Sequence, residues 1–403
     1  MRRPEATRHT ARTALICLPL ALGLLGASLT GCVATVATKA EGAPKACTFA
    51  QISKGGSCIP ADSDSFIKKQ VADSLKKDKL TAAMAGVWID GEKVTSVASG
   101  ETMTGIPATT DMHLRIGAVA IPYLTTELLK LVDEGEVRLD DKISRWLPDL
   151  PHAKAITLKM VASSTSGYAD YVQNPDFIAA LYKNPFRHWT PEELLGFSLS
   201  KPLQKPPGSG FAYSHANWVI LGDIISKVRK RPLAEVMREG ILEPLALTGT
   251  DNPSTAEIPA PVLHSFDNER GVFEDATYWD PSWTLAPGAV MTGTLEDMGK
   301  SVAAWGEGKL LTPESHKVQI TPVAKVTPRT SYALGLAVQN TWLLQNPSFA
   351  GYQGSVAYLP SRKIAIATVA TQGMGSDTAE NFSTALLVSI ANHLAPEKPL
   401  ILD

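Results

Sequence analysis

Residues 115–124, RIGAVAIPYL, lie where a strand-rich segment gives way to a helical one. Pro122 suits the first turn of a helix, because its missing N–H would have no intrahelical partner there. Gly135 stands where a left-handed C-terminal cap is expected. Between them, apolar residues recur at helical spacing, at Leu124, Leu128, Leu131 and Val132. The stretch therefore predicts a helix that begins near residue 122 and buries one apolar face.

Upstream of this stretch, the sequence predicts one helix and two strands. DSFIKKQVADSLKK, residues 64–77, carries its apolar side chains on one helical face. MAGVWIDGEKVTSVASGE, residues 84–101, is typical of two strands joined at Asp90-Gly91. Asp-Gly between two such runs indicates a two-residue hairpin loop.

Downstream, the sequence stays mostly helical to about residue 285 and then returns to strands. The strands are expected in SYALGLAVQ (331–339), GSVAYLP (354–360) and KIAIATVAT (363–371). A last helix is predicted from Asp377, with Glu380 three residues on as in a capping box.

Strands near both ends of the chain, with helices between them, predict one sheet assembled from the two termini. The expected fold class is α/β, with an antiparallel sheet built from N- and C-terminal segments and flanked by helices. A mainly helical subdomain is inserted at about 122–285. A ligand cleft is expected between the sheet and this subdomain.

The first 31 residues have the pattern of an export signal. Arginines precede the apolar run TALICLPLALGLLGASL, and LTGC follows at residues 29–32. A retained membrane helix is the alternative, but the run is short for roughly 30 Å of hydrocarbon and ends in small residues before a cysteine. The sequence predicts a signal peptide at 1–31 and lipidation of Cys32 by fatty acyl chains such as palmitate.

The predicted organisation after cleavage is a lipidated Cys32 with a spacer to residue 61, followed by one folded domain at 62–398. The expected location is extracytoplasmic, anchored to the cell membrane through Cys32. Cys47 and Cys58 lie close together in the spacer. In an oxidising compartment, such a pair predicts a disulfide.

The composition, 44% hydrophobic and 19% charged with a formal net charge of −2, is ordinary for a globular protein. Basic residues are interspersed with acidic ones, so no nucleic-acid partner is expected. No cofactor or metal is expected either, because the histidines lack the paired spacing of a zinc site. Apart from His215, the histidines of the predicted mature chain stand at positions 113, 152, 188, 264, 316 and 393.

Several segments, in this order, resemble the serine β-lactamase and penicillin-binding-protein superfamily, specifically its class C β-lactamase and D-alanyl-D-alanine carboxypeptidase branch. The matching segments are RIGAVAIPYLTTELLKLVDEGEVRLDDKISRWLP, ITLKMVASSTSGYADY, PPGSGFAYSHANWVILGDIISKVRKRPLAEVMREGILEPLALTGT, APGAVMTGTLEDMGKSVAAW and GYQGSVAYLPSRKIAIATVAT. Nearly the whole predicted mature chain takes part. The resemblance implies a β-lactamase/transpeptidase-like fold and a serine-hydrolase family.

The residues that carry the superfamily's chemistry are replaced in this sequence. Members carry Ser-x-x-Lys after the Arg-Ile-Gly, and by position the nucleophile falls on Ala118 and its partner lysine on Ile121. Acyl transfer by this route needs a hydroxyl and, one helical turn away, an amine that takes its proton. Neither side chain supplies such a group, although the N–H of Ala118 could still act as an oxyanion donor.

Two further motifs are also altered. The superfamily's Tyr-x-Asn falls on the triplet that begins at Tyr213 and ends at His215. Its Lys-Thr-Gly or His-x-Gly triplet, on a late strand, falls on the triplet from Tyr352 to Gly354. Tyr213 and His215 have two interpretations: they could move a proton, or they could pack as structural residues.

Ser-x-x-Lys also occurs at 65–68, 74–77 and 198–201, but none of these lies between the hairpin and the long helix. The sequence has no Gly-x-Ser-x-Gly elbow for another serine hydrolase. Three hypotheses follow. The first is a membrane-tethered, non-catalytic envelope homologue that binds a peptidoglycan-type peptide or a protein partner. The second is an esterase, peptidase or β-lactamase that acts through atypical residues such as Tyr213 and His215. The third is a structural scaffold with a filled cleft.

Overall fold

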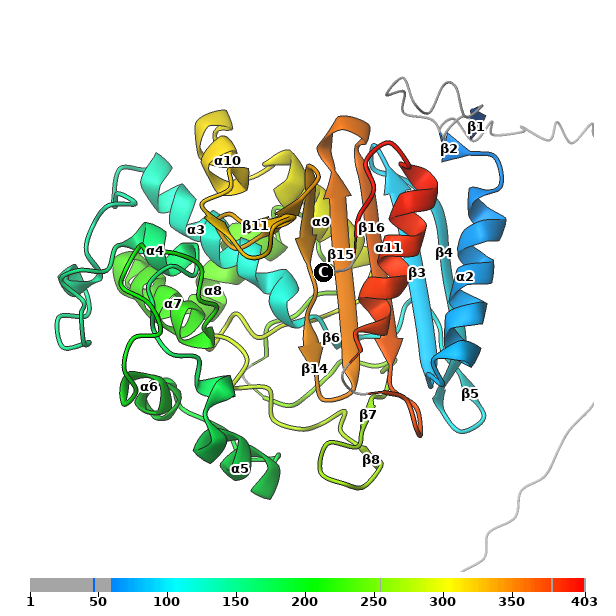
Figure 1. The fold of residues 1–403 in the computed structure, drawn as a ribbon, viewed down its shortest axis with the longest axis horizontal. Helices are drawn as coiled ribbons and strands as arrows, with labels where there is room; N and C mark the ends of the chain where they lie inside the picture. The colour runs from blue at the N-terminus through cyan, green and yellow to red at the C-terminus, as the bar shows by residue number, and fades with distance from the viewer. Residues whose placement is uncertain (1–45, 48–58, 254, 378–379, 402–403) are drawn as a thin grey trace, which may run out of the picture. The chain divides into compact units, whose positions relative to one another are not determined.

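The computed structural model describes residues 46–47, 59–253, 255–377 and 380–401 (Figure 1). Residues 1–31, Cys32 and Cys58 lie outside the described residues, so the export signal, the lipidation and the disulfide stay predictions. None of the helices within the described ranges has the length and apolar character that crossing a membrane requires.

A ten-stranded sheet organises the described chain. Every pairing within it is antiparallel. From one edge to the other the strands are β10 (Ala324–Lys325), β11 (Thr330–Tyr332), β12 (Ala337–Gln339), β13 (Trp342–Gln345), β15 (Tyr352–Leu359), β16 (Ile364–Thr371), β3 (Ala82–Ile89), β4 (Glu92–Met103) and β5 (Ile106–Pro107), while β14 (Ser348–Phe349) pairs with the start of β15.

The two ends of the chain meet at the centre of this sheet. β16 pairs with β3 along its whole length, from Ile364 opposite Ile89 to Thr371 opposite Ala82. Every position of β3, β15 and β16 is buried, because both faces of these strands are covered. The predicted fold class is therefore confirmed: an antiparallel sheet joins N- and C-terminal segments.

The hairpin between β3 and β4 forms at the predicted dipeptide. Asp90 has φ 52° and Gly91 has φ 83°. Both residues lie in the left-handed region that a tight two-residue loop needs, which explains the Asp-Gly sequence.

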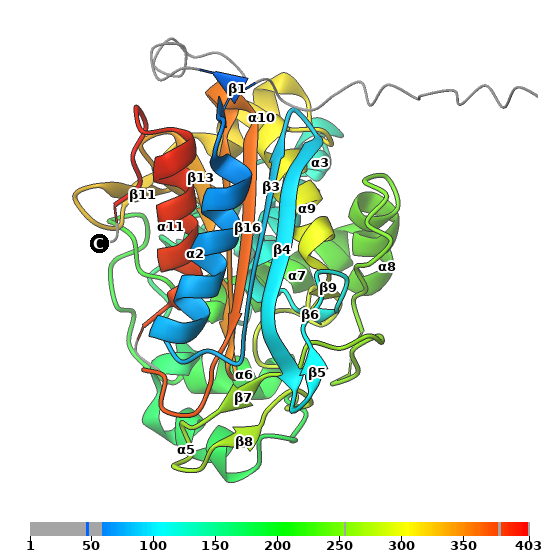
Figure 2. The same ribbon diagram turned by 90° about the vertical axis from the view of Figure 1, so that its right-hand side faces the viewer.

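Helices cover both faces of the sheet. Figure 2 shows α2 (Ser63–Lys77) and α11 (Phe382–Leu394) side by side on one face, with α9 (Leu295–Glu307) on the other. Trp88 of β3 fills the space under α9, since a Cβ added to Gly299 would lie 2.3 Å from its ring. The absence of a side chain at Gly299 therefore allows α9 to pack closely on the sheet.

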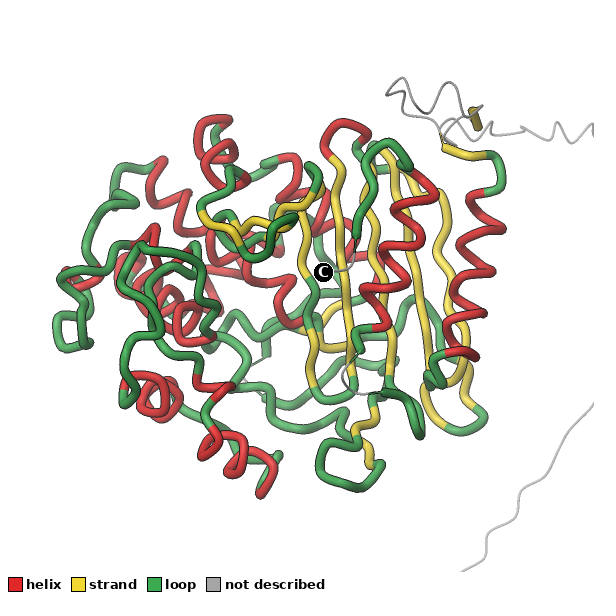
Figure 3. Tube along the Cα trace, in the orientation of Figure 1, coloured by secondary structure: helices red, strands yellow, loops and turns green. Residues whose placement is uncertain are grey.

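Most of the remaining helices lie between β6 and β9 in the chain, beside the sheet (Figure 3). They are α3 (Ile121–Asp133), α4 (Leu158–Ala162), α5 (Pro175–Lys183), α6 (Pro191–Leu199), α7 (His215–Arg229) and α8 (Leu233–Met237), while α10 (Pro313–Ile320) follows α9. Short strand pairs complete the description: β1 (Ala46–Cys47) with β2 (Ile59–Pro60), β6 (Leu114–Arg115) with β9 (Thr292–Gly293), and β7 (Phe266–Asp267) with β8 (Glu274–Asp275).

The helix predicted from RIGAVAIPYL is α3. Its first residue is Ile121, with Pro122 in the first turn, and a short 3₁₀ turn, Gly117–Ala120, precedes it. Gly135 follows the helix with φ 77°, as expected for a left-handed cap.

The last helix begins later than predicted. α11 starts at Phe382, and the side chain of Asn381 caps it by accepting from the Thr384 N–H at 2.9 Å. Gln353 of β15 fixes this start, because its Nε2 donates to the Glu380 carbonyl at 2.7 Å and its Oε1 accepts from the Phe382 N–H at 2.8 Å. The predicted start at Asp377, with Glu380 in a capping box, was wrong.

Candidate functional site

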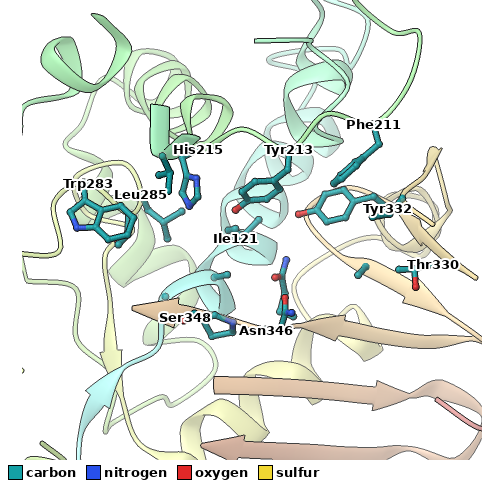
Figure 4. A pocket seen from close by; sticks show the side chains of 18 residues that line it. Ile121, Phe211, Tyr213, His215, Trp283, Leu285, Thr330, Tyr332, Asn346 and Ser348 are labelled. Carbon is teal, nitrogen blue, oxygen red and sulfur yellow. The ribbon is translucent and has the colours of Figure 1, made fainter. Parts of the chain in front are cut away.

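A cavity of about 500 Å³ opens where the start of α3, the segments before α7 and α9, and the β10–β14 part of the sheet meet (Figure 4). It is lined by Gly117, Ala118, Ile121, Val172, Phe211, Tyr213, His215, Trp283, Thr284, Leu285, Val326, Thr330, Tyr332, Ala337, Gln345, Asn346, Pro347 and Ser348. The structure therefore brings four of the predicted site residues together: Ala118, Ile121, Tyr213 and His215.

The positions predicted for a nucleophile and its base carry hydrocarbon side chains here. Ala118 lies in the 3₁₀ turn before α3 and is partly exposed to the cavity. Ile121 is the first residue of α3 and is only 1% exposed. A methyl group and a branched alkyl group can neither attack a carbonyl carbon nor accept a proton.

The turn that carries Ala118 is held by close packing. Gly117 has φ 45°, and a Cβ added to it would lie 2.8 Å from the Cβ of Pro347. Pro347 in turn accepts a hydrogen bond from the Gly354 N–H at 2.8 Å. The segment around Pro347 thus forms one wall of the cavity opposite α3.

Tyr213 is a partly buried phenol whose oxygen already accepts one hydrogen bond. Trp218 Nε1 donates to Tyr213 Oη at 3.1 Å. Burial raises the pKa of Tyr213 above its ordinary value, although the Trp218 hydrogen bond opposes the shift. The phenol therefore keeps its proton at neutral pH and can donate it to a hydrogen-bond acceptor in the cavity.

His215 forms a dyad with Asp170. Its Nδ1 lies 3.0 Å from Asp170 Oδ1, and its backbone N–H donates to the same oxygen at 3.1 Å. A carboxylate can only accept, so Nδ1 carries the hydrogen and Nε2 is the ring nitrogen left for the cavity. Asp170 is buried and also accepts from the Val172 N–H.

The sequence interpretation did not identify Asp170 as a site residue. It stands 45 positions before His215, on a separate loop. No local spacing indicates that the two side chains meet, although Asp170 lies in the ITLKMVASSTSGYADY segment that carried the family resemblance.

The structure does not bring Tyr352 and Gly354 to the cavity. Tyr352 is buried and its hydroxyl donates to the Leu263 carbonyl. The short strand β14 pairs with the start of β15 and lies between these residues and α3. The segment that borders the cavity runs from Gln345, the end of β13, to Ser348, the start of β14, which precedes the predicted strand β15 in the chain, and it contains neither Lys nor His.

The other Ser-x-x-Lys tetrapeptides do not supply a nucleophile to this cavity. Ser65 and Ser74 lie on α2, on the sheet face opposite α9, and neither lines the cavity. Ser198 lies in α6 and donates its hydroxyl to the Ala169 carbonyl.

The cavity is also uncharged apart from its dyad. Its lining residues include no Lys, Arg, Asp or Glu. Nowhere in the described part of the chain do three or more His, Cys, Asp or Glu side chains gather as metal ligands would.

A sheet completed by both termini, a helical insertion and a cavity at the start of α3 define the β-lactamase/transpeptidase-like class of proteins. Residues 66–389 match the beta-lactamase family, and the chain belongs to that family.

The similar proteins include an uncharacterized protein, a penicillin-binding protein and an enzyme. An uncharacterized protein of Mycobacterium tuberculosis is 28% identical over 277 residues, which cover 60% of this chain and 68% of that protein. Penicillin-binding protein 4 of Amycolatopsis lactamdurans is 27% identical over 222 residues, covering 52% of this chain and 55% of that protein. The crystal structure of a D-stereospecific amidohydrolase from Streptomyces sp. matches with a TM-score of 0.72 at 21% identity, over 82% of this chain and 97% of that chain. This last similarity shows the fold.

Proposed function

We propose that this protein is a non-catalytic member of the beta-lactamase family that binds a ligand in the cavity without cleaving it. The observation that carries the proposal is the pair Ala118 and Ile121 at the start of α3, beside a cavity of about 500 Å³. Side-chain volume has not filled the site, so binding can persist where acyl transfer cannot.

The ligand we propose is a peptidoglycan-type peptide or a segment of an envelope protein. The names of penicillin-binding protein 4 and the D-stereospecific amidohydrolase support this class, because penicillin contains amide bonds and an amidohydrolase cleaves such bonds. In this chain the same cleft would hold the amide without attacking it.

A second candidate is a hydrolase that uses the His215–Asp170 dyad as a general base. The 3.0 Å contact favours it, because a carboxylate that orients an imidazole is the base half of a serine-hydrolase triad. The dyad still requires a nucleophile, and in the described part of the chain the ring of His215 hydrogen-bonds to Asp170 and to no hydroxyl. This separates the two candidates: the base is present, but nothing is positioned for it to activate.

A thermal-shift screen of the soluble domain, residues 59–403, tests the binding proposal. A ligand that binds the folded state alone at 100 times its Kd stabilises the protein by about 2.7 kcal/mol, so muropeptides or β-lactams that bind should raise the Tm. Ala118→Leu, which fills part of the cavity, should weaken or abolish the shift. Mass spectrometry should recover the ligand unchanged after incubation.

Two results would contradict this proposal. Steady consumption of the ligand by the native domain would favour the dyad-based hydrolase. A native domain that melts cooperatively yet responds to no ligand would favour the structural scaffold.

We also propose that the protein is an envelope lipoprotein anchored through Cys32. The support is the arginine-rich start, the apolar run and LTGC of the sequence. Replacing Cys32→Ala should abolish labelling by radioactive palmitate and release the protein from the membrane fraction. Cys17→Ala, which alters a cysteine inside the apolar run, is the matched control and should keep the label. Membrane retention of a cleaved Cys32→Ala protein would argue against the anchor.

A further inference from the structure

We propose that the cavity selects an uncharged part of its ligand, in which a carbonyl group adjoins an apolar or aromatic group, and that it discriminates against a carboxylate at this position. This inference rests on the proposed function, because it names the class of ligand that the cleft holds. It follows from the hydrogen-bond donors, the charge and the walls of the cavity.

Two of the hydrogen-bond donors that line the cavity are phenols. Tyr332 lines the cavity at 5% exposure, and its hydroxyl has no hydrogen-bond partner among the described residues. Figure 4 shows it beside Tyr213, with Ile121 beyond them. Burial raises the pKa of Tyr332 well above its ordinary value, and the neighbouring Tyr213 raises it further, although the Gln345 side chain opposes the shift. Both phenols therefore remain protonated.

Each phenol hydroxyl can still donate a hydrogen bond to a ligand. Tyr213 already accepts from Trp218, which leaves its O–H to donate. An unpartnered buried hydroxyl such as that of Tyr332 is costly, and an acceptor would relieve the cost. A carbonyl oxygen has two lone pairs and no hydrogen, so it can accept from both phenols.

The charge of the site argues against a carboxylate. With a neutral imidazole the His215–Asp170 pair carries −1, and with a protonated imidazole it carries zero. No Lys or Arg lines the cavity to offset the negative charge of a carboxylate. Gln345, on the bordering strand, is no substitute for a cation, because its amide is uncharged, and one of its N–H groups already donates to the Gly335 carbonyl at 2.5 Å. A carboxylate that entered the cavity would therefore lose its hydrating water and meet no cation to compensate for that loss, so its binding is disfavoured.

The walls favour a flat or branched apolar group. Phe211 packs against Tyr332 with their ring centroids 5.0 Å apart. Trp283 and Leu285 line the side nearest His215, where the His215 and Trp283 ring centroids are 6.2 Å apart. Burial of an aromatic group between these walls supplies the non-directional part of the affinity, and the phenols orient the carbonyl.

Benzamide, benzoate and toluene form a matched set of probes, because they share a ring and differ in the carbonyl and the charge. Binding to the soluble domain is measured by ligand-observed NMR titration. We expect benzamide to bind at least about tenfold more tightly than benzoate, because the buried carboxylate lacks a cation. Tyr332→Phe should weaken benzamide binding by about 3- to 10-fold, the effect of one neutral hydrogen bond, and leave toluene binding unchanged.

Tyr278→Phe is the control, since Tyr278 is 44% exposed and does not line this cavity. Each variant's melting temperature verifies that the fold persists. Benzoate binding as tightly as benzamide would overturn the inference while leaving the binding function intact, as would a Tyr332→Phe protein with unchanged benzamide affinity. Failure of all three probes to bind the folded native domain would instead overturn the binding function itself.

Discussion

The native protein is expected to remain unlabelled by fluorescent penicillin, even after prolonged incubation. Penicillin labels members of this family by acylating the side-chain oxygen of a serine, and the side chain of Ala118 has no oxygen. Loss of a serine nucleophile or its base costs on the order of a millionfold in turnover, so any residual reaction should fall below detection on a gel. The measurement is in-gel fluorescence of the purified domain, with an active penicillin-binding protein in the same experiment.

Two variants show which missing group matters. Ala118→Ser should be labelled little, because Ile121 still stands where the family's lysine takes the proton of the serine hydroxyl. Ala118→Ser, Ile121→Lys and His215→Asn together restore the family pattern and should regain slow labelling. The new ammonium group is the main obstacle, since Ile121 is 1% exposed and a buried charge needs partners.

The reverse outcomes are equally informative. Rapid labelling of Ala118→Ser alone would show that His215 and Asp170 act as a working base. Stoichiometric labelling of the native protein, mapped by mass spectrometry to a serine or tyrosine, would contradict the non-catalytic proposal.

Gly167→Ala is expected to cause a large loss of stability together with a loss of ligand binding. Gly167 has φ 86°, and a Cβ there would lie 2.0 Å from the Lys205 carbonyl oxygen. A left-handed backbone and a forced shift of packed main chain together cost about 2–5 kcal/mol. The loop that must shift accepts and donates backbone hydrogen bonds, including Gln204 N to Gly167 O at 2.7 Å, and it leads directly to Phe211 and Tyr213.

The matched control is Gly91→Ala. Gly91 has φ 83°, but nothing lies within 4 Å of its added Cβ. It should therefore lose only the backbone contribution, about 1–2 kcal/mol, and should bind ligand normally. Thermal and urea unfolding, followed by the benzamide titration, make the comparison. Equal destabilisation of the two variants would mean that the Lys205 contact does not matter.

Local signals in the sequence were sufficient for much of the fold. Asp90-Gly91 fixed a hairpin because few dipeptides tolerate two left-handed residues in succession. Pro122 and Gly135 marked the ends of α3 within about one residue. The start of α11 could not be predicted in the same way, because Gln353, on a distant strand, holds the residues on either side of its cap. These tertiary hydrogen bonds place the N-cap of the helix at Asn381 and not at the predicted Asp377.

The site was predictable only where the chain itself carries a motif. Ala118, Ile121, Tyr213 and His215 were found because each stands at a fixed distance from Arg-Ile-Gly or Pro-Gly in the sequence. The late-strand residues were misplaced because β13 and β14 are two short strands separated by Asn346 and Pro347, and neither is long enough to show the alternating pattern that identifies a strand. Asp170 contacts His215 because two loops pack together, and no spacing of residues in the sequence predicts such a contact.

The pairing of β16 with β3 has a consequence for how the chain is made. β3 can pair with β16 only after β16 has been synthesised, because Ala82 of β3 pairs with Thr371, near the other end of the polypeptide. During synthesis, the β3–β4 hairpin therefore has one unpaired edge, and such an edge can pair with strands of other chains. Contacts this distant in sequence also form slowly. A chaperone that covers the free edge of β3 until β16 has been synthesised would therefore reduce aggregation of the nascent chain.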